Sequence, residues 1–297
     1  MQAYDDEIVG TALASNVLAL ADRVRTADGV EALSEQHRLA LEHPGLRAHH
    51  LVVTDPAGAV VGYASVLGSS VEMLVDAAHR GEGVGHRLAE AALAVEPTLA
   101  FWAHGDLPGA AQLAEAIGLR RVRELWHLGR DLAPAGAGGD EAALLATPLP
   151  GGERLRTFGG TEAEEHAWLA LNARAFASHP EQGAMTLEDL RVREGETWFD
   201  PSLLWLVHDD GDGALLASMW LKVPDAATGE IYVLGVDPGA QGRGLGRALT
   251  DRALDVLRAR GVDRVELYVE GENARARALY EHSGFTPVAV HAQYGIP

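Results

Sequence analysis

The pattern of hydrophobic and polar positions along the chain predicts a layered α/β protein. A run of β-branched and apolar residues from Ile231 to Val236 predicts a strand, and a proline-marked turn follows it. Apolar residues then recur at helical spacing, at Leu245, Leu249, Ala253 and Leu257. Strands that alternate with helices in this way indicate an α/β sheet with one parallel crossover.

The same pattern occurs twice. Residues 73–93 match residues 234–254, so that Gly83 aligns with Gly244 and Gly85 with Gly246. A β-hairpin pattern precedes each match, with turns at residues 55–58 and 209–213, and a strand and a short helix follow it. Each half therefore reads as helix, β-hairpin, strand, glycine loop, helix, strand, helix and strand. We interpret this repeat as a tandem duplication.

A segment rich in glycine, proline and alanine, residues 132–153, separates the two copies and has the composition of a linker. Thr161 and Glu164 then form a capping box, which opens the first helix of the second copy. We therefore expect a boundary between residues 135 and 150. The expected domains cover residues 1–140 and residues 150–297.

The glycine loop predicts a site for a phosphate-bearing cofactor. Glycines at 242, 244 and 246 allow the backbone to approach a ligand closely, and a helix N-terminus follows at once. Such amides suit a diphosphate. The spacing is neither that of a Rossmann fingerprint nor that of a Walker loop, which needs Gly-Lys-Ser/Thr. The alternative is a helix-entry turn that is glycine-rich by chance, in a chain with 34 glycines.

The remaining motif is Q-x-x-G-x-G, formed by Gln241, Gly244 and Gly246. Together with the run ENARARALYEHSGF at residues 272–285, it resembles the acetyl-CoA loop and closing signature of the GCN5-related N-acetyltransferases, the GNAT family. The resemblance implies an α/β fold of two tandem GNAT domains, each a mixed, mostly antiparallel central sheet flanked by helices. It also implies acetyl-CoA as the acetyl donor.

Differences between the copies indicate where the chemistry takes place. Ser69 aligns with Glu230, Ala114 with Tyr280, and Leu107 with Asn273. The first copy therefore keeps the glycine loop but lacks the polar side chains around it. We expect it to be non-catalytic and the second copy to be catalytic.

Acetyl transfer to an amine needs a base, an oxyanion site and a proton for the leaving thiolate. Glu230 is positioned to be the base, the alternative being a solvated residue at the end of a strand. The resemblance makes Tyr280 the general acid, the alternative being an aromatic ring packed beside Phe285. Gly235 predicts a bulge that frees a backbone amide for the oxyanion. Asn273 is expected to cap the next helix and, by the resemblance, to contact the pantetheine region.

The composition of the chain limits the classes of partner that we expect. The chain has 297 residues, a formal net charge of −19 and no cysteine. This charge disfavours nucleic acid and acidic membrane surfaces as partners. Without cysteine there are no disulfides or thiolate metal sites, which suits a cytoplasmic protein. No signal peptide or apolar span is expected, nor a metal, because no H-E-x-x-H or carboxylate cluster at ligand spacing occurs. We expect a monomer.

Segments outside the generic motifs, such as AFASHPEQG at 175–183 and TWFDP at 197–201, resemble a tandem branch of the GNAT family. Its members acetylate the cysteinyl amine of desacetylmycothiol, a small-molecule thiol pseudo-disaccharide. This resemblance implies substrate contacts from Glu35, Glu181, Lys222, Glu230 and Tyr268.

The same resemblance implies a set of acetyl-CoA contacts in each copy. In the second copy they are Leu234, Gly235, Val236, Gln241, Gly242, Arg243, Gly244, Leu245, Gly246, Arg247, Asn273, Ala274, Arg275, Ala276, Arg277 and Ala278. In the first copy they are Met73, Leu74, Val75, Arg80, Gly81, Glu82, Gly83, Val84, Gly85 and His86. Glu82 departs from the pattern, since it puts an acid beside a diphosphate.

Two other functions stay open at this point. One is a different small-molecule or peptide N-acetyltransferase of the same family. The other is a non-enzymatic acyl-CoA-binding regulator built from two degenerate copies, against which the retention of Glu230, Tyr280 and Asn273 argues.

Overall fold

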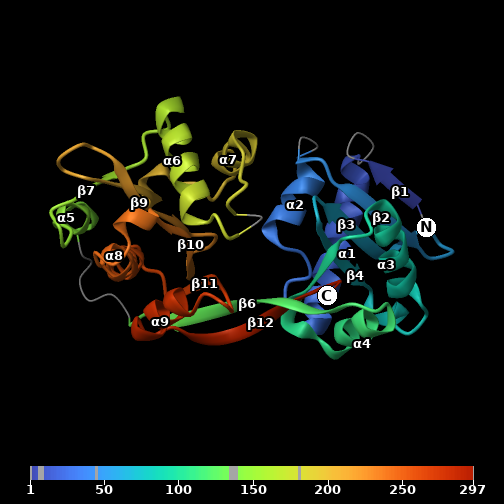
Figure 1. Ribbon diagram of the computed structural model, residues 1–297. Helices are drawn as coiled ribbons and strands as arrows, with labels where there is room; N and C mark the ends of the chain where they lie inside the picture. Colours follow the sequence, from blue (N-terminus) through green and yellow to red (C-terminus); the bar gives the residue numbers. More distant parts are fainter. Residues whose placement is uncertain (1, 6–9, 44–45, 134–139, 180–181, 297) are drawn as a thin grey trace. The chain divides into compact units, whose positions relative to one another are not determined.

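The computed structural model describes residues 2–5, 10–43, 46–133, 140–179 and 182–296. The chain divides into two compact units (Figure 1). The first comprises Met1–Trp126, Glu270–Glu272 and Ala289–Pro297, and the second comprises His127–Val269 and Asn273–Val288. Strands β6 (Arg120–Asp131) and β12 (Thr286–Gly295) therefore contribute residues to both units.

In the first unit an antiparallel ladder joins β1 (Gln2–Asp5), β2 (His49–Thr54), β3 (Val60–Leu67) and β4 (Ser70–Val75). β5 (Ala100–Ala103) pairs with β4 in parallel, and residues 292–294 of β12 pair with β5 antiparallel. The helices are α1 (Thr11–Asp28), α2 (Glu35–Glu42), α3 (Val84–Val95) and α4 (Pro108–Ala116).

This sheet has a hydrophobic core on each face, because side chains alternate along its strands. On β2, Leu51 and Val53 pack in one cluster with Leu88 of α3. Val52, which points the other way, packs in a second cluster with Leu20 of α1. Helices therefore cover both faces of the sheet.

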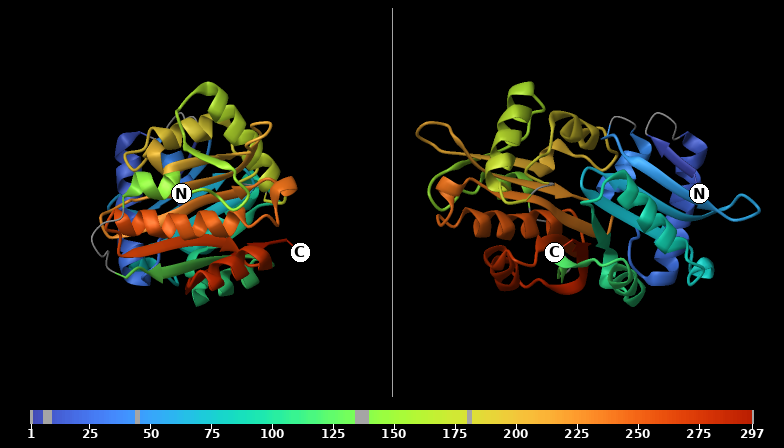
Figure 2. Two further views of the ribbon diagram at one scale, coloured as in Figure 1. Left: turned by 90° about the vertical axis from the view of Figure 1, so that its left-hand side faces the viewer. Right: turned by 45° about the vertical axis from the view of Figure 1, so that its right-hand side comes forward.

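In the second unit β7 (Arg154–Thr157), β8 (Leu204–His208), β9 (Leu215–Lys222) and β10 (Thr228–Val236) form an antiparallel ladder, and β11 (Arg264–Glu270) pairs with β10 in parallel. The helices are α5 (Glu141–Ala146), α6 (Glu162–Ala175), α7 (Leu187–Glu194), α8 (Leu245–Ala259) and α9 (Ala274–His282). Figure 2 shows α6 and α7 on one side of this sheet and α8 on the other.

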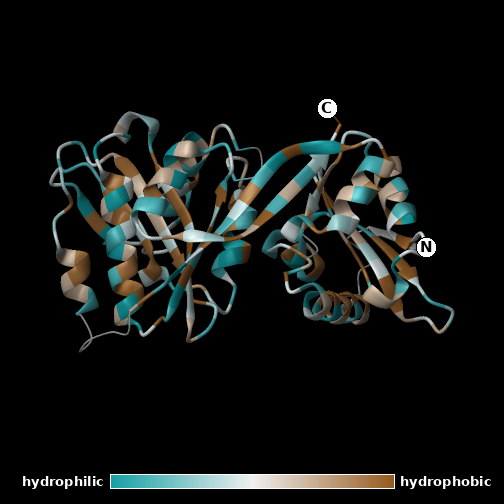
Figure 3. Cartoon of the chain, turned by 90° about the horizontal axis from the view of Figure 1, so that it is seen from below, coloured by the Kyte–Doolittle hydropathy of each residue, from teal (hydrophilic) through white to brown (hydrophobic). Residues whose placement is uncertain are grey.

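The core of the second unit is rich in aromatic residues. Trp168 of α6 and Trp220 of β9 are fully buried and meet edge to face, with ring centroids 5.4 Å apart. Leu190 of α7 and Val233 of β10 belong to the same cluster. In Figure 3 hydrophobic residues gather on the strands and on one side of the helices, as amphipathic packing requires.

Several local predictions are confirmed. The two hairpins turn at Asp55 and Asp209, whose carboxylates each accept a backbone N–H inside the turn. The capping box of Thr161 and Glu164 opens α6 with both reciprocal hydrogen bonds. Apart from these predictions, the described residues include no helix that is long and apolar enough to cross a bilayer.

Two parts of the fold differ from expectation. Each unit has a further helix before its hairpin, α2 in the first and α7 in the second, and α7 opens with its own capping box at Thr186 and Asp189. The expected linker is also partly helical, because α5, with Asp140 as its N-cap, lies within it. Arg252 of α8 donates a hydrogen bond to the Thr147 carbonyl just after α5, so tertiary packing orders this segment.

Candidate active site

The glycine loop of the second unit joins β10 to α8. Asp237 accepts the Gly239 N–H and closes a short 3-10 turn. Gly242 and Gly244 then have φ angles of +86° and +83°, which glycine adopts without the strain that a Cβ would cause. α8 begins directly after Gly244, and among the described residues no side chain caps its N-terminus. Its first amides are therefore available to an anion such as a diphosphate.

The first unit repeats this geometry. Gly81 and Gly83 have φ angles of +79° and +76°, and α3 begins directly after Gly83. Asp76 caps the preceding 3-10 turn just as Asp237 does in the second unit. In both units, therefore, a helix begins directly after a glycine turn.

Strands diverge beside both loops. The parallel ladder between β10 and β11 runs from Thr228 to Ile231, and the one between β4 and β5 runs from Ser70 to Glu72. Residues 234–236 and residues 73–75 lie beyond the ends of these ladders. The neighbouring parallel strand therefore does not occupy their backbone edge, and a ligand can hydrogen-bond there.

The bulge of β10 does not lie where the sequence predicts it. Its register with β9 shifts between Ile231 and Val233, whereas Gly235 stays in register opposite Ser218. The extra residue is Tyr232, whose ring packs against Trp220 with centroids 5.1 Å apart. Packing of this aromatic ring, and not a glycine, thus accompanies the irregularity in the strand.

Helix α9 lies against the glycine loop. The Asn273 side chain caps α9 by accepting a backbone N–H at 3.0 Å, which confirms its predicted capping role. Arg275 donates to the Gln241 side-chain oxygen at 2.7 Å. A Cβ at Gly246 would lie 3.5 Å from Leu279, so α8 and α9 approach closely. The expected cofactor residues of the second unit are thereby gathered around one loop.

Tyr280 lies on the buried side of α9. Tyr280 is 6% exposed, and its ring packs edge to face against Phe285, with ring centroids 5.7 Å apart. Burial raises the pKa of the Tyr280 phenol above its ordinary value, because the charged phenolate would lose hydration. The phenol therefore stays protonated at neutral pH. This packing contact is compatible with a proton-donating role.

Three of the expected substrate residues share one face of the second unit. Lys222, Glu230 and Glu266 are register partners on β9, β10 and β11, and partners in a ladder project from the same face. Tyr268, two residues after Glu266, projects from that face as well. The Lys222 ammonium lies 4.3 Å from the centroid of the Trp198 ring, a cation–π contact that restricts the side chain.

Two residues on this face were not among the site residues predicted from the sequence. His127 of β6 and Glu266 of β11 are joined by a hydrogen bond of 2.9 Å between His127 Nε2 and Glu266 Oε2. The other oxygen of Glu266 accepts from Arg264 Nε at 2.7 Å. The alternation of polar residues in RVELYVE was the available signal, since it places Arg264, Glu266 and Tyr268 on one side of a strand.

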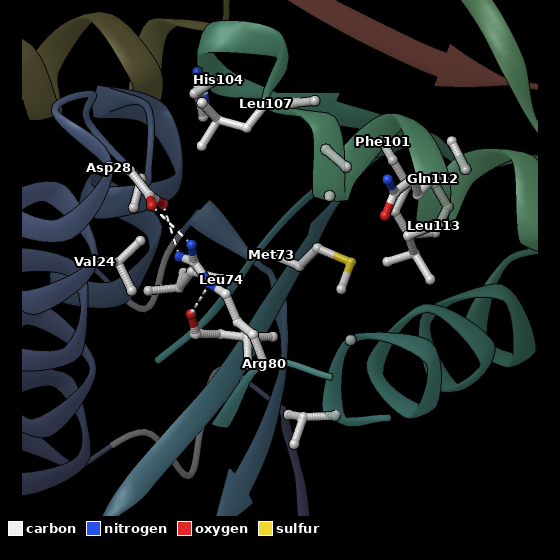
Figure 4. A pocket seen from close by; sticks show the side chains of 18 of the residues that line it. Val24, Asp28, Met73, Leu74, Arg80, Phe101, His104, Leu107, Gln112 and Leu113 are labelled. Atoms are coloured by element: carbon white, nitrogen blue, oxygen red, sulfur yellow. Dashed lines mark hydrogen bonds and ion pairs between the residues drawn. The ribbon is translucent and has the colours of Figure 1, made fainter. Parts of the chain in front are cut away.

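A cavity of about 610 Å³ lies within the first unit (Figure 4). Met73 and Leu113 face each other across it, and it lies between the diverging strands and α4. Nine of the ten acetyl-CoA residues expected in the first copy line it: Met73, Leu74, Val75, Arg80, Gly81, Gly83, Val84, Gly85 and His86. Its size is in the range of small-molecule sites.

Two charged residues of this loop lie differently with respect to the cavity. Arg80, which aligns with Gln241, forms two hydrogen bonds with Asp28, at 2.8 and 2.7 Å. Glu82 does not line the cavity, and its carboxylate is 3.2 Å from His79. The acid that departs from the loop pattern is therefore paired with a histidine, and the arginine faces the cavity (Figure 4).

A buried carboxylate lies where β4 leaves the parallel ladder. Glu72 is 2% exposed, and its oxygens accept the Ser34 N–H at 2.7 Å and approach His104 Nε2 at 3.2 Å and His37 Nε2 at 3.9 Å. Burial by itself raises the pKa of this carboxyl, but the two histidines and the hydrogen bonds lower it to about 2. Burial lowers the pKa of His104, and Glu72 more than compensates, so that the pKa is raised.

This network makes a stability prediction. Glu72→Gln is expected to lower the free energy of unfolding by about 3–5 kcal/mol, because it leaves a buried histidine charge unpaired. The carboxylate contributes stability above its ordinary pKa of 4.5 and loses it as the pH falls towards 2. The raised pKa of His104 has the opposite sign: its contribution is present below its ordinary value of 6.5 and is lost as the pH rises through the folded value.

Chemical unfolding at about pH 6 and about pH 3 measures this difference. The gap between wild type and variant is expected to shrink at the lower pH. Glu90→Gln, at a side chain that is 65% exposed, is the control and is expected to have no effect. An equal gap at both pH values would contradict the assignment of the network.

The remaining predicted residues fall as follows. Glu35 is the first residue of α2 in the first unit and is partly buried. Glu181 lies outside the described residues. No group of three or more His, Cys, Asp or Glu side chains that could hold a metal occurs in the described part of the chain.

The candidate site of the second unit lies in a region of the chain that matches a known protein family. The family model described as "Acetyltransferase (GNAT) family" matches residues 166–285, which include the glycine loop, Glu230 and Tyr280. The chain is similar in structure to a GCN5-related N-acetyltransferase from Sphaerobacter thermophilus, with a TM-score of 0.70, 25% identity, and coverage of 95% of this chain and 92% of that one. It also shares the fold of a tandem GNAT protein from the clavulanic acid biosynthesis pathway, with a TM-score of 0.68, 21% identity, and coverage of 99% and 98%.

These likenesses confirm the predicted fold class of two tandem GNAT domains. In sequence, the chain is 47% identical over 283 residues to a mycothiol acetyltransferase of Clavibacter sepedonicus, with coverage of 94% of this chain and 90% of the relative. The chain belongs to the mycothiol acetyltransferase family.

Proposed function

We propose that this acetyltransferase moves the acetyl group of acetyl-CoA to the cysteinyl amine of desacetylmycothiol, giving mycothiol and CoA. The observation that carries the proposal is the arrangement of the second unit. A glycine turn and an uncapped helix N-terminus, among the described residues, lie at the end of β10, the strand that carries Glu230.

In the proposed reaction the neutral amine attacks the thioester carbonyl. A C–N bond forms, and the C–S bond to CoA breaks. Glu230 accepts the proton of the amine, directly or through a water molecule. An α-amine has an ordinary pKa of about 7.7–8.0, so a carboxylate base assisted by position is sufficient.

The backbone of Leu234 to Val236 is proposed to stabilise the oxyanion. Support comes from the β10–β11 ladder, which stops at Ile231 and leaves this edge to a ligand. In related acyl transfer, one hydrogen-bond donor to the oxyanion stabilises the transition state by about 2.7–4 kcal/mol. Tyr280 is proposed to protonate the departing thiolate, since its raised pKa keeps the phenol protonated and ready to donate.

The acceptor is proposed to bind on the face that carries Lys222, Glu230 and Tyr268. Lys222 can donate to the hydroxyls of a pseudo-disaccharide, and carboxylates can accept from them or hold the ammonium form. Glu35 and Glu181 are also proposed as acceptor contacts, and their support is the family resemblance.

The expected domain of residues 1–140, most of which lies in the first unit, is proposed to hold acetyl-CoA without catalysis. Its loop has positive φ angles at the same positions as the loop of the second unit, and nine of the ten expected residues line its cavity. Ser69 and Ala114 replace the base and the acid. Catalysis is assigned to residues 150–297.

We also propose that the enzyme acts as a monomer in the cytoplasm, without a metal and without nucleic acid or membrane partners. The support is the net charge of −19 and the lack of cysteine.

Release of the CoA thiol in the presence of purified desacetylmycothiol tests the function. We expect turnover with this acceptor at a kcat/KM at least about 10²-fold above that for a simple cysteine amide or an aminoglycoside, because the sugar and inositol contacts contribute binding energy. Equal or greater activity with those amines would favour another N-acetyltransferase. Binding of acetyl-CoA with no transfer to any amine would favour a regulator.

A further inference from the structure

We propose that His127 is a positioning residue of the acceptor site, which holds the Tyr268 ring in the orientation that receives the acceptor. This inference rests on the proposed function, because it takes Tyr268 as an acceptor contact. It adds a residue of β6 to which the sequence assigned no role, and this residue acts through Tyr268 and not on the reacting atoms.

The first support is the contact between the two rings. The imidazole of His127 stacks on the Tyr268 ring, with centroids 4.7 Å apart and planes inclined by 12°. Tyr268 is 47% exposed, so the stacked imidazole covers a ring that is otherwise open to solvent over a large part of its surface. A stacked partner on one face therefore limits the directions in which the phenol can point.

The second support is that His127 is itself held firmly. Its side chain is only 14% exposed, and Nε2 is hydrogen-bonded to Glu266 at 2.9 Å. Glu266 is fixed in turn by Arg264, which also pairs with Asp131 of β6. Charge-assisted hydrogen bonds of this kind are shorter and stronger than neutral ones, so the imidazole plane is well defined.

The third support is the place of this cluster in the sheet. Glu266 is the register partner of Glu230, the proposed base, on the adjacent parallel strand. Adjacent strands are about 4.8 Å apart, so the His127–Glu266 pair flanks the base on the acceptor face. Arg264 and His127 both bind Glu266, so this carboxylate has a structural role beside the proposed base.

Three replacements of His127 separate the contacts. His127→Phe keeps a stacked ring and loses the hydrogen bond, His127→Gln keeps a hydrogen-bonding group and loses the ring, and His127→Ala loses both. We expect the alanine and glutamine variants to raise KM for the acceptor about three- to tenfold, with kcat and the KM for acetyl-CoA unchanged. His127→Phe is expected to restore KM to within about twofold. His166→Ala, on α6 with a side chain 60% exposed, is the control.

A double-mutant cycle shows whether His127 acts through Tyr268. In a Tyr268→Ala background, His127→Ala is expected to produce no further rise in KM. The inference would be overturned if His127→Ala raised KM for the acceptor by the same factor with and without Tyr268→Ala. It would also be overturned if the folded, active His127→Ala single variant showed no rise in KM. If the alanine variant does not fold, the comparison of the phenylalanine and glutamine variants decides the question. Failure of the proposed function is distinguishable from failure of this inference. In the first case the wild-type enzyme itself would not acetylate the amine of desacetylmycothiol.

Discussion

Replacing Glu230 with glutamine is expected to lower kcat for acetyl transfer by about 10²–10⁴ without unfolding the protein. Glutamine has the same shape but cannot accept the proton of the attacking amine. Initial rates of CoA thiol release with a saturating acceptor measure the effect. Part of the rate is expected to return as the pH rises above about 8, where the amine is already neutral.

Two companion variants complete this experiment. Tyr280→Phe keeps the edge-to-face contact with Phe285 and removes the phenol, so kcat is expected to fall by about 10² or more. Glu162→Gln, at a side chain that is 75% exposed on α6, is the control for loss of a carboxylate. Wild-type turnover by the double variant Glu230→Gln/Tyr280→Phe would refute both assignments.

The second large effect is expected from a matched pair of glycines. Gly244 and Gly83 precede α8 and α3 with φ angles of +83° and +76°, and a valine at either position is strained by about 1–3 kcal/mol. Gly244→Val is expected to reduce kcat/KM for acetyl-CoA at least about tenfold. Gly83→Val is expected to leave kcat/KM within about twofold and to remove one of two acetyl-CoA binding sites in equilibrium titration.

Each glycine variant controls for the other, because the backbone strain is the same and only the unit differs. Thermal unfolding checks that both proteins remain folded. Loss of turnover in Gly83→Val together with normal turnover in Gly244→Val would reverse the division of labour between the units.

Features that depend on residues close in sequence could be predicted. The capping box of Thr161 and Glu164, the helix cap at Asn273 and the turns at Asp55 and Asp209 all form between residues at most a few positions apart. The positive φ angles of Gly242 and Gly244 follow from the absence of a Cβ. Such local chemistry is nearly independent of what the segment later packs against.

Features that depend on distant partners could not be predicted. The irregularity of β10 falls at Tyr232 and not at Gly235, and the Tyr232 ring packs against Trp198 and Trp220. The helix α5 forms in a sequence with linker composition, and Arg252 of α8 hydrogen-bonds the chain just after it. In both cases packing outweighs the local preference.

The sequence by itself determined that two copies of a glycine loop precede two amphipathic helices, and that only the second copy kept Glu230, Tyr280 and Asn273. These are properties of residue identity and spacing, which local backbone geometry translates directly into turns and helix ends. Only the tertiary structure decided that His127 and Glu266 meet beside Tyr268, and that Glu72 is buried among histidines. Pairing between strands far apart in the chain creates these contacts, and hydrophobic periodicity specifies which face a residue occupies but not which strand lies next to it.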